Sequence, residues 1–447
     1  MWRPAGLGVL GALGLLGALS ACRDARPTVA PVAPVGTDSA PTPDAGALVD
    51  GGEAAGSAVV GPVPCEPALD SEGASAPHDT MTLTAVAFTD LPGWADDHLS
   101  QAVPPLLLSC TRLAALAPAA PVGADGHGGT ARQWRTLCAA AAAVPAGDDA
   151  AARAMFEAQT VPYQAAGTTG PDGKLTGYDV QEMHGSRTPT KRYRFPVHGR
   201  PADLVMVDLS QHIKDSHGRR IWGRLDAKGE LVPYYTRGEI RGGALAGKHL
   251  EILYVDDAVD LLFAHIEGSA RVVMEGGGPG SDVWLEFAGK NGRAYRGVGG
   301  VLKSMGELSA PGSGTMPGIR AWFAAHPAKF DEVVDQTHSY VFFKESAQPG
   351  AIGSQMVVLT PRRSMAIDRA FIAQGTPIWV DTRIPVIGGT GATPWHQLLI
   401  AQDTGGGILG AVRGDIYWGA DPEAAELGGR MGGPGRYWLL LPKGVTQ

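Results

Sequence analysis

The sequence has few cysteines, no strong excess of charge of one sign and no long apolar run. The balance of charge and the short apolar run each exclude a class of protein. It contains 447 residues, of which 4 are Cys, and its formal net charge is −8. Its Lys and Arg form no basic stripe with interleaved aromatic residues, so nucleic acid is not an expected partner. The apolar run at residues 7–19 is shorter than the ~20 residues of a spanning helix, so no mature transmembrane helix is expected there.

Three motifs with known chemistry are also missing. There is no G-x-S-x-G sequence, which argues against a serine esterase. The glycine-rich stretch at 276–280 lacks a following Lys-Ser or Lys-Thr, so it does not predict a phosphate loop. The 12 His are scattered without ligand spacing to Cys or Glu, and we therefore expect no metal and no other cofactor.

Glycine and proline, by contrast, are abundant. There are 63 Gly and 34 Pro, and much of this excess lies in the first 80 residues. The remaining glycines mark turns, which favours a β-rich fold over a helical one. Apolar residues make up 44 % and charged residues 18 % of the chain, an ordinary balance for a soluble globular protein long enough for two cores.

Residues 1–22 are expected to form a lipoprotein signal peptide. One basic residue, a short apolar run and small residues at the cut are typical of a secretory signal. The sequence Leu-Ser-Ala-Cys at 19–22 resembles the bacterial lipobox, which implies a lipidated Cys22 and an anchor at the periplasmic face of the cell envelope. Arg23 in place of an Asp favours the outer membrane. An ordinary signal peptide with an incidental Cys is the alternative.

Residues 23–79 follow the expected anchor and are dominated by Pro, Ala, Gly, Val, Asp and Ser. Such a segment cannot bury enough apolar surface to offset its ordering entropy, so it predicts a flexible tether. Export also implies an oxidising compartment, in which disulfides persist. We expect Cys110 to pair with Cys138, closing a loop worth ~3 kcal/mol. Cys65 is left over, and its pairing with either of the two stays open.

The rest of the chain changes from helical to strand-like texture. Residues 94–160 carry Leu, Trp and Phe at spacings of three and four, which predicts helices. Further helices are expected to begin near Asp257 and Gly318. Short apolar runs bounded by turn residues predict strands at 193–197, 203–207, 283–287, 340–343, 357–359, 377–380, 398–400 and 437–441. The pattern predicts a mainly β fold with peripheral helices, as a barrel or a sandwich.

Three aspartates of the C-terminal hundred residues stand at the ends of expected strands: Asp368, Asp403 and Asp415. An Asp at a strand end often only caps a turn. Asp415, however, is followed by Ile, Tyr417 and Trp418, an apolar neighbourhood that raises the pKa of a carboxyl toward the range of a general acid. The two aromatic rings are expected to offer a platform for a sugar.

The segments around these aspartates, 401–406 and 410–419, resemble the three-aspartate domain of the membrane-bound lytic murein transglycosylase A family. Other matches occur in consistent order over residues 95–445, namely 175–178, 233–240, 289–295, 339–343 and 359–364. The resemblance implies a double-psi β-barrel built from 80–198, with N-terminal helices, and 350–447. It also implies a smaller inserted β-barrel domain at 199–349, with a glycan groove between the two.

The resemblance further implies a carbon–oxygen lyase, a lytic transglycosylase that acts on the glycan strands of peptidoglycan as a monomer. Asp415 would be the single catalytic acid and base, and would yield a 1,6-anhydro product. Asp403 and Asp368 would support the site by hydrogen bonds. The residues expected to bind substrate are Tyr178, Gln402, Ser269 and Tyr417.

The chain also departs from the family pattern. Asp-Val-Gln stands at 179–181 where the family has Tyr-Glu-Pro, Glu267 replaces a Gln, and His338 replaces an Asn. Because these positions belong to the expected groove, two alternatives remain. One is a hydrolytic glycosidase, and the other is a wall-binding lipoprotein without turnover.

Overall fold

The computed structural model describes residues 79–124, 127–209, 212, 220–278, 280–308, 310 and 312–445. The predicted signal peptide with Cys22, the tether up to residue 78 and Cys65 lie outside the described residues. Asp79, the last residue of the predicted tether, accepts a hydrogen bond from the Ala411 N–H at 2.6 Å and so belongs to the fold. No helix within the described ranges is long and apolar enough to cross a membrane.

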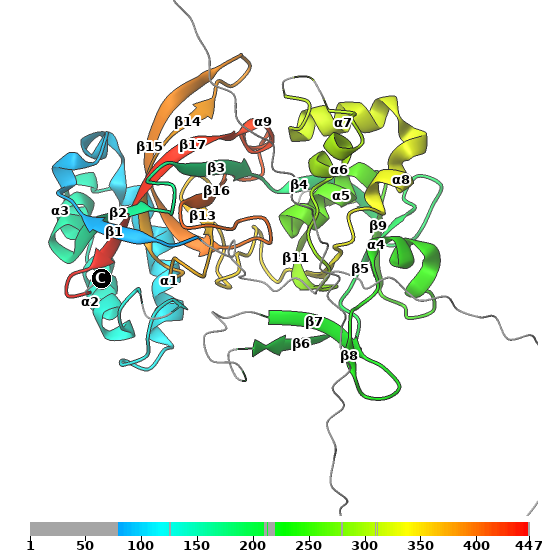
Figure 1. Cartoon of the computed structure of the whole chain (residues 1–447), viewed down its shortest axis with the longest axis horizontal. Coiled ribbons are helices and arrows are strands. Elements are labelled where there is room, and N and C mark those ends of the chain that lie inside the picture. Colours follow the sequence, from blue (N-terminus) through cyan, green and yellow to red (C-terminus); the bar gives the residue numbers. More distant parts are fainter. Residues whose placement is uncertain are drawn as a thin grey trace, which may run out of the picture. The chain divides into compact units, whose positions relative to one another are not determined.

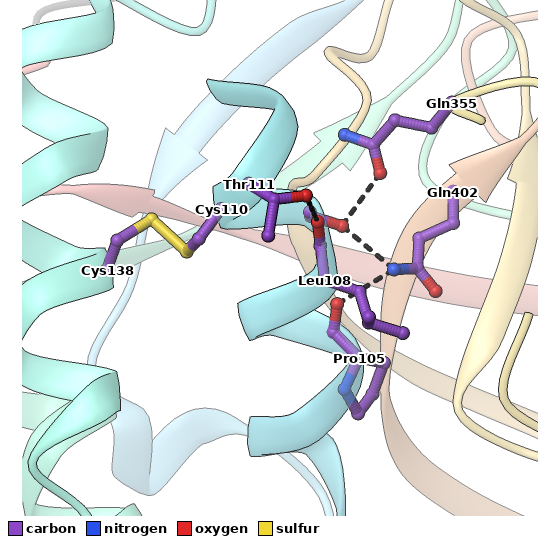
Figure 2. The surroundings of a disulfide bond; sticks show 8 residues. Pro105, Leu108, Cys110, Thr111, Cys138, Gln355 and Gln402 are labelled. Atoms are coloured by element: carbon purple, nitrogen blue, oxygen red, sulfur yellow. Dashed lines mark hydrogen bonds between the residues drawn. A yellow bond between two sulfur atoms is a disulfide. The ribbon is translucent and has the colours of Figure 1, made fainter. Parts of the chain in front are cut away.

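The N-terminal part of the described chain is helical, as its periodicity predicts (Figure 1). After β1 (Thr82–Ala85) and short 3-10 turns, three α-helices follow: α1 (Val103–Ala114), α2 (Ala131–Ala142) and α3 (Asp149–Gln159). The Asp148 carboxylate caps α3 by accepting from the Ala151 N–H at 2.8 Å, which satisfies one donor of its first turn. A disulfide between Cys110 and Cys138 joins α1 to α2 (Figure 2).

Six strands close into a ring that unites the two ends of the described chain. The ring runs β17–β14–β15–β13–β16–β3 and returns to β17, and β2 and β1 extend the sheet from β17. The strands are β2 (Thr160–Ala166), β3 (Gly173–Tyr178), β13 (Ser364–Ile367), β14 (Pro377–Pro385), β15 (Ala392–Asp403), β16 (Arg413–Tyr417) and β17 (Gly432–Pro442). The mainly β fold with peripheral helices is confirmed, and the ring fits a barrel. The double-psi crossing stays a prediction.

One hydrophobic core joins the barrel to the N-terminal helices. It includes Trp134 of α2 and Leu106 of α1 together with Trp379 and Ile400 of the strands, all fully buried. Burial of each such side chain contributes about 2 to 3 kcal/mol relative to exposure. Strand β15 is buried continuously from Leu398 to Gln402, because α1 covers the face that does not look into the barrel.

A second, six-stranded sheet follows the order β12-β11-β10-β4-β9-β5. An isolated bridge between Gly199 and Phe343 of β12 brings its two edges together. Its strands are β4 (Gln181–Ser186), β5 (Phe195–His198), β9 (Glu251–Val255), β10 (Ser269–Met274), β11 (Val283–Lys290) and β12 (Val341–Glu345). Strands β6 (Val205–Asp208), β7 (Arg220–Leu225) and β8 (Leu231–Val232) form a separate small sheet.

The change from one sheet to the other comes earlier than the predicted domain limit at residue 198. Only two residues separate β3 of the barrel from β4 of the second sheet (Figure 1). Strand β4 pairs with β10 and β9 rather than with barrel strands, and β5 pairs with β9. The backbone leaves the barrel sheet after Tyr178, the last residue of β3, and enters the second sheet at Gln181, the first residue of β4.

The second part of the chain also carries the two predicted helices. Helix α5 (Ala258–Glu267) begins after Asp257, whose carboxylate accepts from the Val259 N–H at 2.6 Å. Helix α7 (Met316–Ala325) begins two residues before the predicted start, with Thr315 as its cap. The remaining helices are α4 (Arg237–Glu239), a π-helix at Ile240–Ala244, α6 (Val298–Ser304), α8 (Phe330–Val334) and α9 (Pro422–Arg430). The strand predicted at 357–359 is wrong, since this segment forms only one isolated bridge.

Candidate active site

A pocket of about 240 Å³ brings together acidic side chains from β15, β16 and α5. Asp403 and Asp415 come from the barrel strands, and Glu267 comes from the last position of α5. Its lining residues are Gly177, Tyr178, Ile266, Glu267, Tyr295, Ala366, Asp403, Thr404, Gly405, Gly406, Gly407, Ile408, Arg413 and Asp415. Of two larger pockets, the one of about 320 Å³ has a single carboxyl, Glu251, among its lining residues and the one of about 610 Å³ has none, so the cluster of carboxyls belongs to the smaller pocket.

Asp415 lies in the middle of β16, between β13 and β3. It is opposite Ala366 in the antiparallel pairing and opposite Thr176 in the parallel one. The Thr176 hydroxyl donates to its carboxylate at 2.5 Å, and no ion pair of the described residues includes Asp415. Burial raises the pKa of Asp415 to about 6, against the opposing effects of Arg413 and Thr176. The carboxyl can therefore hold a proton near neutral pH and release it easily.

Gly414 explains how the strand approaches its neighbours so closely at this point. A Cβ atom there would lie 2.3 Å from the Met365 Cε and 3.0 Å from the Leu175 Cδ2. A side chain at this position would have to displace the buried ends of Met365 and Leu175, which pack against β16 beside Asp415.

Asp403, at the end of β15, has both carboxylate oxygens engaged. One accepts the Ser354 and Thr404 N–H groups at 2.8 and 2.9 Å, and the other accepts the Tyr178 hydroxyl at 2.8 Å. Burial raises the pKa of Asp403, and these hydrogen bonds oppose that rise. The geometry thus makes Asp403 an anchor for the Tyr178 ring at the pocket wall.

Asp368 does not line the pocket. It is 1 % exposed, and its two oxygens accept the Ala370 and Gly410 N–H groups at 2.9 and 2.8 Å. Burial raises the pKa of Asp368, while the two backbone donors lower it. Because Gly410 belongs to the loop that leads into β16, Asp368 ties that loop to the end of β13.

Gln402, which was predicted to bind substrate, does not line the pocket. It is fully buried, and its amide donates to the Pro105 carbonyl at 2.8 Å and to the Ser109 hydroxyl at 2.9 Å (Figure 2). Its carbonyl accepts from the Ser364 hydroxyl at 2.6 Å. The pairing of β15 with β13 skips Gln402 at a bulge, and there Asp403 takes the pocket side while Gln402 takes the side of α1.

Tyr417 and Ser269 also do not line the pocket. Tyr417 is 3 % exposed and packs against Tyr178 with 5.3 Å between ring centroids. Trp418 is buried against Trp395, so neither ring offers the expected sugar platform. Ser269 is 5 % exposed at the start of β10, where it pairs with β11. Of the four residues predicted to bind substrate, Tyr178 alone lines the pocket.

The sequence analysis assigned no role to two pocket residues. Glu267 carries a third carboxyl, and Tyr295 carries an exposed ring that lies near the backbone of Gly407. The family resemblance placed Glu267 in the expected groove, and the structure puts it at the end of the helix predicted from Asp257. Nothing in the local pattern at Tyr295 indicates its place, since it stands in a loop without regular structure after β11.

Comparisons with known proteins assign these segments. The family description "MltA specific insert domain" matches residues 174–344, and "3D domain" matches 363–441. A crystal structure of membrane-bound lytic murein transglycosylase from Agrobacterium tumefaciens is 31 % identical with a TM-score of 0.69, covering 81 % of this chain and 98 % of that one. The chain belongs to the MltA family.

Another member, MltA from Neisseria gonorrhoeae in a monoclinic crystal form, is 32 % identical with a TM-score of 0.66, covering 84 % of this chain and 96 % of that one. The curated "Membrane-bound lytic murein transglycosylase A" of Escherichia coli K12 is 34 % identical over 209 residues, 46 % of this chain. That match spans 55 % of the E. coli protein, about half its length.

Both family segments contribute to the pocket. Asp403 and Asp415 lie in the 3D domain match, and Glu267 and Tyr295 lie in the MltA insert match. The pocket of this MltA member therefore depends on side chains from both segments.

Proposed function

We propose that this MltA member is a lytic transglycosylase that cleaves the β-1,4 bond between N-acetylmuramic acid and N-acetylglucosamine. The observation that carries the proposal is the Asp415 carboxyl, which faces a pocket, has one hydroxyl partner and has a pKa raised to about 6. The names of the relatives, lytic murein transglycosylases, support the same reaction.

In the first half of the proposed reaction, Asp415 is the general acid. Its carboxyl donates a proton to the glycosidic oxygen while the bond from that oxygen to the anomeric carbon of muramic acid breaks. The Thr176 hydroxyl, which donates to Asp415 at 2.5 Å, stabilises the carboxylate left behind.

In the second half, the Asp415 carboxylate accepts the proton of the muramic 6-hydroxyl as that oxygen bonds to the anomeric carbon. The product carries a 1,6-anhydro ring, the carboxyl is protonated again, and no water is consumed. One carboxyl suffices because the nucleophile belongs to the same sugar and is already near its target. Asp403 stays an anchor with three donors, and Asp368 acts at a distance by holding the loop before β16.

A hydrolytic glycosidase is the second candidate, and Glu267 favours it. Hydrolases place two carboxyl groups on either side of the scissile bond, the second to activate water or to attack. Glu267 lines the same pocket as Asp415 and comes from a different element. This candidate requires Glu267 as a carboxylate, whereas its pKa lies well above the usual range because of burial and the acidic neighbours.

The cellular setting belongs to the proposal as well. We infer that the protein acts in cell-wall turnover as a monomer on peptidoglycan strands. A lipid on Cys22 would hold it at the periplasmic face of the envelope, at the outer membrane. Its support is the lipobox resemblance and the word "membrane-bound" in the names of the relatives.

Digestion of purified sacculi, with products identified by mass, tests the proposal. We expect anhydro-muropeptides from the wild type and none from Asp415→Asn, which keeps the shape of the side chain and loses its proton. Asp172→Asn is the matched control, because Asp172 is an exposed carboxyl paired with Arg436. Products with free reducing ends would establish the hydrolase, and sacculus binding without product would establish the non-catalytic alternative.

A further inference from the structure

Glu267 is the one carboxyl of the pocket that the proposed reaction does not use. It is the last residue of α5 and lines the pocket together with Asp415 and Asp403 of the barrel. A ligand that fills this pocket and reaches Asp415 therefore also meets a carboxyl carried by the MltA insert segment.

The three pocket carboxyls differ in the hydrogen bonds they receive. Asp403 accepts from three donors and Asp415 from one. In the part of the chain that the structure describes, the side-chain carboxyl of Glu267 has neither a hydrogen bond nor an ion pair with another residue. A half-buried carboxyl without a protein partner is free to bind whatever enters the pocket.

The surroundings of Glu267 disfavour a negative charge. It stands at the C-terminal end of α5, where the helix dipole is negative. The groups that face it are Asp415 and Asp403 from the barrel, Asp179 between β3 and β4, and the Tyr295 hydroxyl after β11. Arg413, the basic residue of the pocket, acts on Asp415. Burial and the three carboxyls raise the pKa of Glu267 well above its usual range.

We propose that Glu267 binds the glycan strand as a neutral carboxylic acid and donates a hydrogen bond to a sugar oxygen, such as an acetamido carbonyl. A neutral carboxyl offers one donor and one acceptor, as a side-chain amide does, whereas a carboxylate offers acceptors only. Ionisation of Glu267 would remove the donor from the bound sugar, so binding weakens as the pH rises. The role of Glu267 rests on the proposed function, since it assumes a glycan ligand.

Calorimetric binding of chitohexaose, a β-1,4-linked hexamer of N-acetylglucosamine, tests this role without turnover. The full chain carrying Asp415→Asn is compared with Asp415→Asn/Glu267→Gln between about pH 5 and about pH 9. We expect the dissociation constant of the single variant to rise about tenfold with pH, and that of the double variant to change less than about twofold.

A matched control is Glu423→Gln in the Asp415→Asn background, because Glu423 is an exposed carboxyl paired with Arg362. This control should keep the pH dependence. Equal pH dependence with and without Glu267→Gln, pH-independent binding in both proteins, or no chitohexaose binding at any pH would each overturn the role of Glu267.

Failure of the proposed function can be distinguished from failure of the role of Glu267. If chitohexaose binding shows the expected dependence on Glu267 but the wild type makes no anhydro product from sacculi, Glu267 binds glycan and the lyase proposal is wrong. If anhydro product forms and binding is insensitive to Glu267→Gln, the lyase proposal stands and the role of Glu267 is wrong.

Discussion

An aspartate stands at the end of β13 and another in the middle of β16, and the surroundings of the two carboxyls differ. Asp368 follows β13 and accepts two backbone N–H groups away from the pocket. Asp415 lies on the neighbouring strand, opposite Ala366, and accepts a single hydroxyl while facing the pocket. A carboxyl whose two oxygens both accept backbone donors holds the backbone in place, and a carboxyl with a single donor that faces a pocket stays available for chemistry.

Two adjacent residues of β15, Gln402 and Asp403, also differ in whether they face the pocket. Gln402 has its amide and its carbonyl engaged by α1 and β13, whereas Asp403 reaches the pocket wall. Substitutions of the residues held by hydrogen bonds away from the pocket, such as Gln402 and Asp368, should therefore lower stability. Substitutions of residues that face the pocket should change catalytic activity.

The largest change in stability is expected for Gln402→Ala. It removes hydrogen bonds to Pro105, Ser109 and Ser364 and leaves a cavity in a fully buried site, so the unfolding free energy should fall by about 3 kcal/mol. Denaturant unfolding measures this loss. Gln374→Ala, which removes one exposed hydrogen bond to Ser354, is the control and should cost less than about 0.5 kcal/mol. An increased KM with unchanged stability would restore Gln402 as a binding residue.

Asp368→Ala should lower the unfolding free energy by about 2 kcal/mol, because it leaves the buried Gly410 and Ala370 N–H groups without acceptors. Activity on sacculi should fall too, since the loop that leads into β16 loses its tie. Asp368→Asn keeps one acceptor oxygen and should lose less. An unchanged melting temperature for Asp368→Ala would contradict this role in holding the backbone.

Asp415→Asn should change how stability depends on pH. The pKa of Asp415 is raised from 3.8 to about 6 in the folded protein, so the folded state binds the proton more tightly than the unfolded chain. The stability that the folded protein gains from this tighter proton binding at Asp415 is complete below about pH 4 and is lost as the pH rises through about 6. The wild type should therefore lose about 1.5 kcal/mol relative to Asp415→Asn between these pH values. Parallel stability curves for the two proteins would show that Asp415 has an ordinary pKa.

The smallest effect is expected for Tyr178→Phe. The variant removes one hydrogen bond to Asp403, which keeps its two backbone donors, so the cost should be about 1 kcal/mol. The ring contact with Tyr417 remains. Tyr163→Phe is a control for the loss of a tyrosine hydroxyl on β2, the strand that precedes β3 in the sequence. A loss of stability above that of Asp368→Ala would mean that Tyr178, like Asp368 and Gln402, acts mainly in stabilising the fold.

Local patterns predicted much of the fold because they report local constraints. The cap at Asp257 and the apolar face that follows it predicted α5, and the apolar run from Pro377 predicted the start of β14. The parts of β14 and β15 next to the turn that joins them escaped prediction. Residues 392–397 begin β15 without an apolar run, because they are exposed or half-buried.

The site was predicted less well than the fold, and β15 shows why. From Leu398 to Gln402 the strand is buried on both faces, so alternation does not reveal which face a polar residue takes. Gln402 therefore passed for a pocket residue. Glu267 was expected in the groove only through the family resemblance, and no role was assigned to it, because its place depends on a distant contact, the approach of α5 to strands more than a hundred residues later in the chain.

Carboxyl carbon NMR of aspartate-labelled full-length protein, titrated over pH, tests the central claim most directly. The resonance that disappears in Asp415→Asn belongs to Asp415. The account predicts that this carboxyl titrates with a pKa of about 6. Titration near the ordinary value of 3.8 would leave no proton on Asp415 at neutral pH and would contradict its role as the acid.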